Sequence, residues 1–322
     1  YPGKCHAIYT IQLSIVIDGY IMAKPLMPAL DAEQFAVSLD GNVTLRGYQG
    51  EVQEGTPLVL LHSINAAPSA MEIRPLFEHY RDKRPVMAPD LPGFGLSDRP
   101  AASYSAVQYA RWIAEWLKDF KSPPDVVALS LTGEFVARAI LEQGTRIRSL
   151  TLISPTGMGT ASPPSLPDGS RLERLLNSPW VGQSLFRALT TKASIRWFLN
   201  KAFVGPTPEY LVQYAWETAR QPGAHLVPLK FLTFSLFTEQ AMSRLYSRLT
   251  LPCLVLYDDD PNIGFERLPE LVDENGQWTI KRLVPSKGLP HWELPVDTIT
   301  ALDEFWALSA QTAMTSDDVA EQ

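Results

Sequence analysis

The sequence is poor in cysteine and lacks long uniform runs of apolar or basic residues. Only two cysteines occur, Cys5 and Cys253, and they build neither a disulfide framework nor a Cys/His metal pattern. The net charge is −7 without a long basic run, so no nucleic-acid partner is expected. The apolar stretch from Ala7 to Met22 is interrupted by Gln12 and Asp18, which makes it too polar to span a bilayer. The sequence therefore predicts no metal, no cofactor and no transmembrane segment.

The composition is otherwise that of a globular protein, with 45% hydrophobic and 20% charged residues. The 322 residues suffice for one large α/β domain or two average ones. Residues 1–27 are expected to form an extension whose role the pattern does not assign, and residues 310–322 a flexible tail. Because no convincing cleavage site follows the N-terminal apolar stretch, we expect a cytoplasmic location. The sequence does not indicate an oligomeric state.

Ser130 lies where a predicted buried strand meets a predicted helix. The run Asp125-Val-Val-Ala-Leu129 is short and β-branched, as in a strand covered on both faces. The stretch from Leu131 to Gln143 gathers apolar residues on one helical face, and Gly144 is suited to end it. A strand that reverses sharply into a helix lifts the central side chain out of the sheet, so Ser130 is a candidate nucleophile. The structural alternative is a serine that only caps a core helix.

Strand-like and helix-like segments alternate on both sides of this turn. After a hairpin at 35–48, buried strands are predicted at 57–61, 86–90, 125–129, 149–153, 254–257 and 279–284. Helices are predicted at 106–120, 131–143 and 296–308. This alternation predicts the α/β class, with a doubly wound and mostly parallel sheet built from residues 28–155 and 248–309.

The alternation stops over residues 156–247, where an all-helical insertion is predicted. Its helices are expected at 172–176, 181–189, 195–203, 209–220 and 229–237. From Pro155 to Thr250 the chain carries ten Lys and Arg and five Asp and Glu, a net charge of +5 that leaves −12 for the remainder. We expect this insertion to form a cap over Ser130, and its charge suggests a preference for anionic substrates or surfaces.

Three kinds of side chain that could act together follow one another along the chain. Ser130 comes first, then the carboxylates Asp258 to Asp260 after a predicted strand, then His291 after the last predicted strand. A serine hydroxyl needs an imidazole to take its proton and a carboxylate to orient that imidazole. Since the carboxyl ends of parallel strands meet at one edge of the sheet, the pattern favours nucleophilic catalysis by Ser130.

From Phe35 to Leu308 the sequence resembles the α/β-hydrolase superfamily, specifically the serine hydrolase branch that carries a helical cap. Ala-Leu-Ser-Leu-Thr-Gly around Ser130 is similar to the Gly-x-Ser-x-Gly of that family. His62-Ser63 resembles its His-Gly dipeptide, and Asp90-Leu-Pro-Gly-Phe-Gly-Leu-Ser-Asp98 its Asp-x-Pro-Gly-x-Gly-x-Ser signature. The order Ser, Asp, His is also that of the family. The resemblance implies an α/β-hydrolase fold with an inserted helical cap.

The resemblance also implies a Ser-His-Asp triad of Ser130, His291 and Asp260. Asp260 is preferred to Asp258 because Tyr257-Asp-Asp-Asp resembles the Gly-x-x-Asp of the family. Asp258 stays open as the alternative acid.

Further residues acquire roles from the same resemblance. The oxyanion hole would consist of the backbone amides of Leu131 and of Ile64 or Ser63. The candidates for the substrate pocket are His62, Asn65 and Trp292. His62 also has a structural interpretation, in which it braces its own loop by hydrogen bonds.

The histidine departs from the family pattern. In the family it lies about five residues before Glu-x-Pro, whereas His291 is two residues before Glu293-Leu-Pro295, so that a strict alignment places Gly288 at the histidine position. The other four histidines lie elsewhere, which leaves His291 as the only credible base. Either the loop has a different register or the triad is broken. We expect Gly288 and Pro290 to give the chain a path that brings His291 to both Ser130 and Asp260.

The resulting prediction is a serine hydrolase that acts on small to medium apolar carboxylic esters through an acyl-enzyme. Its expected partner is a small-molecule substrate. Ser130 counts against the haloalkane dehalogenase and epoxide hydrolase branches, which use aspartate as the nucleophile. Carbon–carbon bond hydrolases, perhydrolases and lyases of this fold keep serine and remain open. The alternative from another class is a ligand-binding protein on a degenerate hydrolase scaffold.

Overall fold

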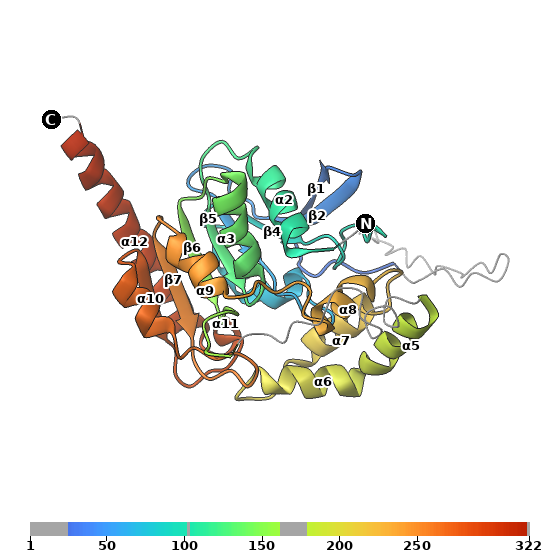
Figure 1. Ribbon diagram of the computed structural model, residues 1–322. Coiled ribbons are helices and arrows are strands. Elements are labelled where there is room, and N and C mark those ends of the chain that lie inside the picture. Colours follow the sequence, from blue (N-terminus) through green and yellow to red (C-terminus); the bar gives the residue numbers. More distant parts are fainter. Residues whose placement is uncertain (1–24, 102–103, 162–178, 321–322) are drawn as a thin grey trace, which may run out of the picture.

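The computed structural model describes residues 25–101, 104–161 and 179–320, which are built around one eight-stranded sheet (Figure 1). Its strands, in chain order, are β1 (Glu33–Leu39), β2 (Val43–Gln49), β3 (Leu58–Leu61), β4 (Val86–Asp90), β5 (Asp125–Leu129), β6 (Ser149–Ile153), β7 (Cys253–Tyr257) and β8 (Trp278–Arg282). Their order across the sheet is β1-β2-β4-β3-β5-β6-β7-β8. From β4 to β8 all neighbouring strands are parallel, whereas β2 pairs with β1 and β4 in the antiparallel sense. The predicted fold class is confirmed.

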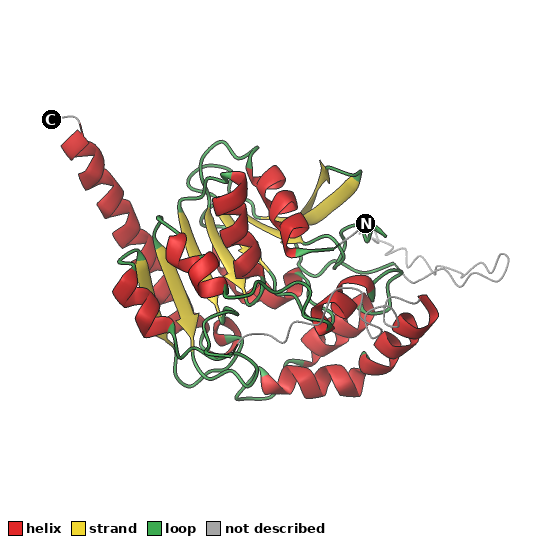
Figure 2. Ribbon diagram, viewed as in Figure 1, coloured by secondary structure: helices red, strands yellow, loops and turns green. Residues whose placement is uncertain are grey.

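Helices cover both faces of this sheet (Figure 2). They are η1 (Ala70–Ile73), α1 (Arg74–Tyr80), α2 (Ala106–Leu117), α3 (Thr132–Gln143), α10 (Leu268–Glu274), α11 (Pro290–Glu293) and α12 (Pro295–Ala320). All side chains of β3, β5 and β6 are buried, as expected for strands covered on both sides.

Alternate residues of the central strands divide the core into two halves. In β5, Val126 and Ala128 pack in one hydrophobic cluster with residues of α2 and α3. Val127 and Leu129 belong to a second cluster, with residues of α1 and α12. Because side chains alternate between the two faces of a strand, the continuous apolar run seen in the sequence supplies both halves. Ser130 follows directly at the carboxyl end of this strand.

The segment between β6 and β7 contains helices and no strand within its described part. These helices are α5 (Pro179–Leu189), α6 (Lys192–Lys201), α7 (Glu209–Thr218), α8 (Leu226–Leu232), α9 (Ala241–Arg244) and η2 (Tyr246–Arg248). Figure 1 places α5 to α8 beyond the end of the sheet toward which the parallel strands point, the side on which Ser130 lies. We call α5 to α8 the cap helices. The helix predicted at 172–176 lies outside the described residues.

The last helix is longer than the sequence predicted. We expected it to end near residue 308 and to be followed by a flexible tail from residue 310, but α12 continues to Ala320. The physical reason is that residues 309–320 contain neither glycine nor proline, so nothing in the covalent chain ends the helix.

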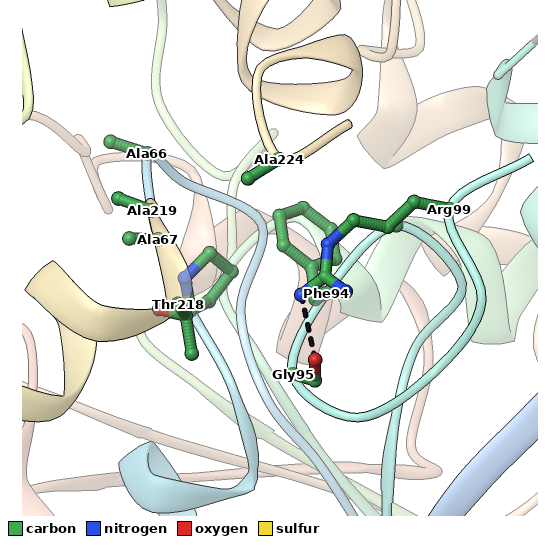
Figure 3. Close-up of a pocket in the computed structure, with 10 residues that line it drawn as sticks. Ala66, Ala67, Phe94, Gly95, Arg99, Thr218, Ala219 and Ala224 are labelled. Carbon is green, nitrogen blue, oxygen red and sulfur yellow. Dashed lines mark hydrogen bonds between the residues drawn. The ribbon is translucent and has the colours of Figure 1, made fainter. Parts of the chain in front are cut away.

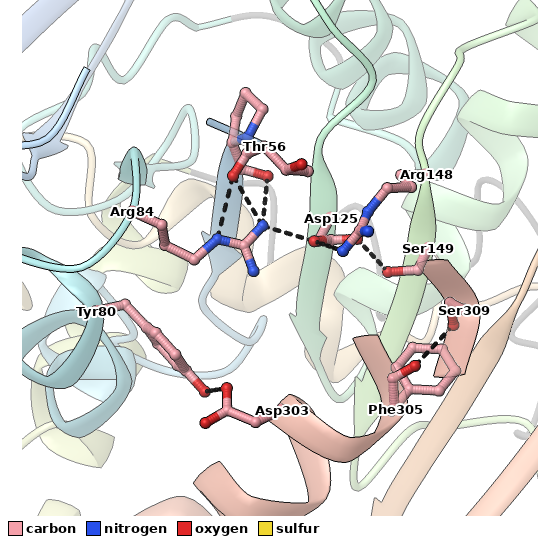
Figure 4. Close-up of polar contacts among 10 residues, drawn as sticks. Thr56, Tyr80, Arg84, Asp125, Arg148, Ser149, Asp303, Phe305 and Ser309 are labelled. Atoms are coloured by element: carbon pink, nitrogen blue, oxygen red, sulfur yellow. Dashed lines mark hydrogen bonds and ion pairs between the residues drawn. The ribbon is translucent and has the colours of Figure 1, made fainter. Parts of the chain in front are cut away.

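A buried carboxylate forms several hydrogen bonds at the end of the sheet where the parallel strands begin (Figure 4). Asp125, the first residue of β5, is fully buried and accepts hydrogen bonds from Arg84, Arg148 and Ser149. Arg84 also donates to the carbonyl of Thr56 just before β3, and its guanidinium lies 4.6 Å from the ring centroid of Trp306 in α12. Three parallel strands and one helix are thus joined far from Ser130.

Candidate active site

The turn at Ser130 has the strained backbone that a nucleophile elbow requires. Ser130 lies between β5 and α3 with φ of 50°, a left-handed conformation that costs a non-glycine residue about 1–3 kcal/mol. Its amide donates to the carbonyl of Ile153 in β6 at 2.9 Å, which fixes the end of the strand. A Cβ at Gly133 would lie 2.7 Å from Cδ2 of Leu152, so glycine lets α3 pack this close to the sheet. The predicted strand, turn and helix at this position are confirmed.

The Ser130 side chain reaches the surface, and a backbone amide without an acceptor in the described part of the chain follows it. Its side chain is partly exposed, and no described residue forms a hydrogen bond with its hydroxyl. The amide of Leu131, the next residue, likewise has no acceptor among the described residues. Leu131 leads into α3, whose N-terminal end favours negative charge. The arrangement suits a developing oxyanion.

Ser63 and Ile64 were the two candidates for the second backbone amide of the oxyanion hole, and they differ in their hydrogen bonding. The Ser63 amide donates to Oε2 of Glu72 at 2.9 Å, so it is not available to a ligand in this structure. The Ile64 amide has no acceptor among the described residues and stays the candidate. Asn65 donates to Ser63 Oγ and to Glu72 Oε1, at 2.7 Å each, and thereby stiffens the same loop.

His62 braces its loop, as the structural interpretation of this residue expected. Nε2 accepts a hydrogen bond from the Leu91 amide at 2.9 Å, and Nδ1 lies 2.6 Å from the Ser63 carbonyl. Since a carbonyl can only accept, Nδ1 must carry the proton. Burial lowers the pKa of His62 from 6.5 to about 4, which keeps the ring neutral. The hydroxyl of Thr132 in α3 donates to the His62 carbonyl at 2.7 Å and joins this loop to the elbow.

His291 does not make the two contacts that we expected of it. It is fully buried in α11, and its Nε2 donates to the backbone carbonyl of Glu72 at 2.7 Å. The buried Nδ1 has no hydrogen-bond partner among the described residues, so bonds to Ser130 and Asp260 are both absent. Burial lowers the pKa of His291 from 6.5 to about 4. In this structure Pro290 begins a short helix, and the ring faces the carbonyl of Glu72 in η1, so the role of His291 as the base stays a prediction.

Gly288 lies beside the predicted acid, with which His291 forms no hydrogen bond. A Cβ at Gly288 would be 2.6 Å from Oδ2 of Asp260. The position to which strict family spacing assigns the histidine is therefore next to Asp260, but its residue has no side chain. Asp260 is partly buried, and burial raises the pKa of its carboxyl although the amide of Asn262 donates to it at 2.7 Å.

Asp258 has a structural role in the described part of the chain. It is buried and accepts hydrogen bonds from Nε of Arg282 and from the amide of Ser286, at 2.8 Å each. These bonds hold the segment after β8 against the end of β7. Each of the two carboxylate oxygens of Asp258 thus accepts one hydrogen bond.

Glu72 is the residue of this region that sequence reasoning missed. Its carboxylate accepts from Ser63 and Asn65, and its carbonyl accepts from His291 and from Nε1 of Trp292 at 2.5 Å. Burial raises the pKa of the Glu72 carboxyl. It therefore links the predicted oxyanion loop to the helix that carries the predicted base. A single carboxylate in the apolar stretch 70–73 was the only signal in the sequence.

A small pocket lies between the cap and the loops that follow β3 and β4 (Figure 3). It is lined by small residues such as Ala66, Ala67 and Ala219, with the Arg99 side chain at one side. Its volume of about 10 Å³ holds about one water molecule. Arg99 donates to the Gly95 carbonyl at 2.6 Å, so it mainly supports the loop. Ser130 does not line this pocket.

Two negative findings apply to the described residues. No group of three or more His, Cys, Asp or Glu side chains there could hold a metal ion. No helix in the same ranges combines the length and the apolar character needed to cross a membrane.

The sequence matches the model of the alpha/beta hydrolase family over residues 58–302. Among solved structures it is similar to a serine hydrolase involved in carbazole degradation (TM-score 0.67, 16% identity, 86% of this chain and 99% of that one). It is also similar to an esterase from Exiguobacterium antarcticum (TM-score 0.65, 14% identity, 84% and 98%) and to one from Thermogutta terrifontis (TM-score 0.66, 16% identity, 86% and 99%). At such identities these likenesses show the fold.

Two curated relatives have more similar sequences over a shorter region. The mouse protein named 1-acylglycerol-3-phosphate O-acyltransferase ABHD5 is 31% identical over 148 residues, which are 44% of this chain and 40% of that protein. The rat protein of the same name is 29% identical over 163 residues, or 49% of this chain and 44% of that protein. The chain thus spans less than half the length of the curated relatives that it matches.

Proposed function

Because the chain belongs to the alpha/beta hydrolase family, we propose that it is a serine hydrolase that cleaves small to medium apolar carboxylic esters at Ser130. One observation carries this proposal: Ser130 has a left-handed backbone at the β5–α3 turn and a hydroxyl without a hydrogen-bond partner among the described residues. Strain of this kind persists only where the surrounding structure enforces it, and it is concentrated at functional sites.

In the proposed reaction, Ser130 Oγ attacks the ester carbonyl carbon and the carbonyl oxygen becomes an oxyanion. The amides of Leu131 and Ile64 stabilise that charge, and removing one such donor typically costs about a hundredfold to a thousandfold in turnover. The serine proton passes to the base and from it to the departing alcohol. Water then attacks the acyl-enzyme carbonyl and gives its proton to the base, which passes it to Ser130 Oγ as the carboxylic acid leaves.

The proposed base is His291, which has to come within about 2.6–3.2 Å of Ser130 Oγ in order to take its proton. Its Nε2 proton is donated to the Glu72 carbonyl in the structure, which leaves the lone pair on the unpartnered Nδ1. Hydrogen bonds of a catalytic base are often long or misaligned without a ligand. We therefore expect the His291 ring to exchange its hydrogen bond with the Glu72 carbonyl for one with Ser130 Oγ during the reaction.

The test combines covalent labelling with turnover. A fluorophosphonate probe should label the wild-type protein, and a series of p-nitrophenyl esters should define the preferred chain length. Ser130→Ala should abolish probe labelling and ester turnover while leaving the melting temperature unchanged, because loss of the nucleophile typically costs on the order of a millionfold in turnover. His291→Ala should strongly lower labelling and turnover. If Ser130→Ala retains most of the esterase activity, the proposal is wrong.

A second candidate is a ligand-binding protein on a degenerate hydrolase scaffold. The observation that favours it is that Gly288 lies next to Asp260, while His291 forms no hydrogen bond with this predicted acid. This candidate predicts no fluorophosphonate labelling of the folded wild-type protein. It also predicts that p-nitrophenyl butyrate raises the melting temperature in a saturable way without being hydrolysed, and that Ser130→Tyr removes this stabilisation by filling the site.

A further inference from the structure

Helix α6 exposes two large aromatic side chains next to each other. Trp197 is 55% and Phe198 53% exposed, and their ring centroids lie 4.8 Å apart in an edge-on arrangement. The same helix is anchored, because Ile195 is buried in a cluster with Val212 and Ala215 of α7. The aromatic pair therefore belongs to a helix that is firmly packed. Its exposure is a property of the folded cap.

The neighbouring helix α5 exposes a row of aliphatic residues. Val181, Leu185 and Leu189 are 41%, 39% and 37% exposed, and a spacing of four residues places them on one face of the helix. In Figure 1, α5 and α6 form the outer border of the cap, on the side away from the sheet. We call Val181, Leu185, Leu189, Trp197 and Phe198 the apolar cap surface. Clustered exposure of this kind marks interaction sites.

Cationic side chains accompany the apolar cap surface. Lys201 Nζ lies 3.6 Å from the ring centroid of Trp197. Arg187 and Lys192 are exposed on other sides of the same two helices, where Lys192 Nζ lies 4.7 Å from the ring centroid of Trp216. Residues 155–250 carry a net charge of +5, whereas the remainder of the chain carries −12. Apolar anchors flanked by Lys and Arg are the composition of helices that lie in the headgroup region of a membrane. The positive charge selects an anionic surface.

We propose that the apolar cap surface docks on an anionic lipid bilayer, with Trp197 and Phe198 inserted among the acyl chains and the flanking cations on the lipid headgroups. Through these helices the whole protein binds at the surface of the bilayer and does not span it. It does not depend on the proposed ester hydrolysis, because the residues involved lie outside the candidate active site. A failure of one proposal therefore leaves the other standing.

The test is flotation of the full chain with lipid vesicles. Vesicles of phosphatidylcholine with roughly 30% phosphatidylserine should carry the wild-type protein upward, and pure phosphatidylcholine vesicles or high salt should reduce binding. Trp197→Ser combined with Phe198→Ser should lower the vesicle-bound fraction about tenfold or more, because both apolar anchors are lost. The matched control is Val284→Ser with Val296→Ser, since these side chains are 63% and 73% exposed outside the cap and should not matter.

Three outcomes would overturn this proposal. One is wild-type protein that does not float with anionic vesicles. Another is equal loss of binding in the two double variants, which would point to a general effect of exposed apolar area. The third is concentration-dependent self-association in analytical ultracentrifugation that only the aromatic double variant removes, because the surface would then be a contact between copies of this chain. Melting temperatures equal to that of the wild type show that both double variants are folded.

Discussion

At the scale of single residues, the chain combines an intact nucleophile turn with a displaced base. The signals for Ser130 are local: a β-branched strand, small neighbours and a helix directly after it, all within about 20 residues of sequence. The position of His291 depends on the carbonyl of Glu72, which is 219 residues away in the chain. No periodicity or spacing rule connects such partners. The elbow could therefore be predicted from the sequence, and the partner of the imidazole could not.

Moving the imidazole to position 288 tests which carboxylate is the acid. In a His291→Ala background, Gly288→His is expected to restore a measurable fraction of fluorophosphonate labelling, because its ring would start beside Asp260. The Asp260 carboxylate has to swing aside for the new Cβ, and the Ala202 Cβ at 3.4 Å leaves limited room. Gly288→Ala in the same background is the control, since it adds the same steric conflict without an imidazole. Equal labelling of both variants would argue against Asp260 as the acid.

Glu134 is expected to make the stability of the fold depend on pH. It is buried in the first turn of α3, where its carboxylate accepts hydrogen bonds from the hydroxyl of Thr156 and from the amide of Thr238 at 2.7 Å. These two residues lie near the two ends of the insertion between β6 and β7. Burial raises the pKa of Glu134 from 4.5 to about 7 despite both bonds.

The sign of the effect follows from proton binding. Between pH 4.5 and about 7 the folded state holds this proton and the unfolded state does not, so stability decreases as the pH rises through this window. Glu134→Gln should remove up to about 3 kcal/mol of that pH dependence, because one pKa unit corresponds to about 1.4 kcal/mol. Urea unfolding of both proteins across the window measures the difference. Parallel stability curves would show that Glu134 keeps an ordinary pKa.

At the scale of secondary-structure elements, the alternation of strands and helices was readable because each buried strand is a short apolar run. The cap helices were also anticipated, within a few residues at each end. The last helix was predicted to end too early, because the sequence after Leu308 has no apolar period even though its residues permit a helix. The sequence pattern does not show that the first half of α12 packs on the sheet, and this packing lets the helix continue.

Asp125 is the residue on which the assembly of these elements depends most. Asp125→Ala removes the common acceptor of Arg84, Arg148 and Ser149, and leaves two partly buried guanidinium groups unpaired. Breaking a buried ion pair from one side typically costs about 3–5 kcal/mol, so the variant should unfold at clearly lower urea concentration. The control is Asp303→Asn, which disturbs only the 2.8 Å bond from Tyr80 and should cost much less. Similar losses in both variants would contradict the central role of Asp125.

At the scale of the whole molecule, a positively charged helical insertion lies over the end of an acidic α/β core. The existence, position and charge of the insertion could be predicted from the sequence, since they follow from composition and period. The contacts that attach the cap could not be predicted from the sequence. They are made by backbone amides, which every residue except proline has. Glu293 supplies the attachment near the candidate site. It accepts hydrogen bonds from the amides of Val204, Gly205 and Lys287, at 2.6, 3.1 and 3.0 Å.

Glu293 therefore joins the end of α6 to the short helix that carries His291. Glu293→Ala should increase hydrogen exchange at Val204, Gly205 and Lys287, because these amides lose their acceptor, while exchange in the central strands stays unchanged. It should also change the p-nitrophenyl ester preference, since the cap and His291 become less tightly coupled. Glu239→Ala, which removes an exposed cap carboxylate, is the matched control and should leave exchange unaltered. If exchange at the three amides is the same in both variants, Glu293 does not hold the cap in solution.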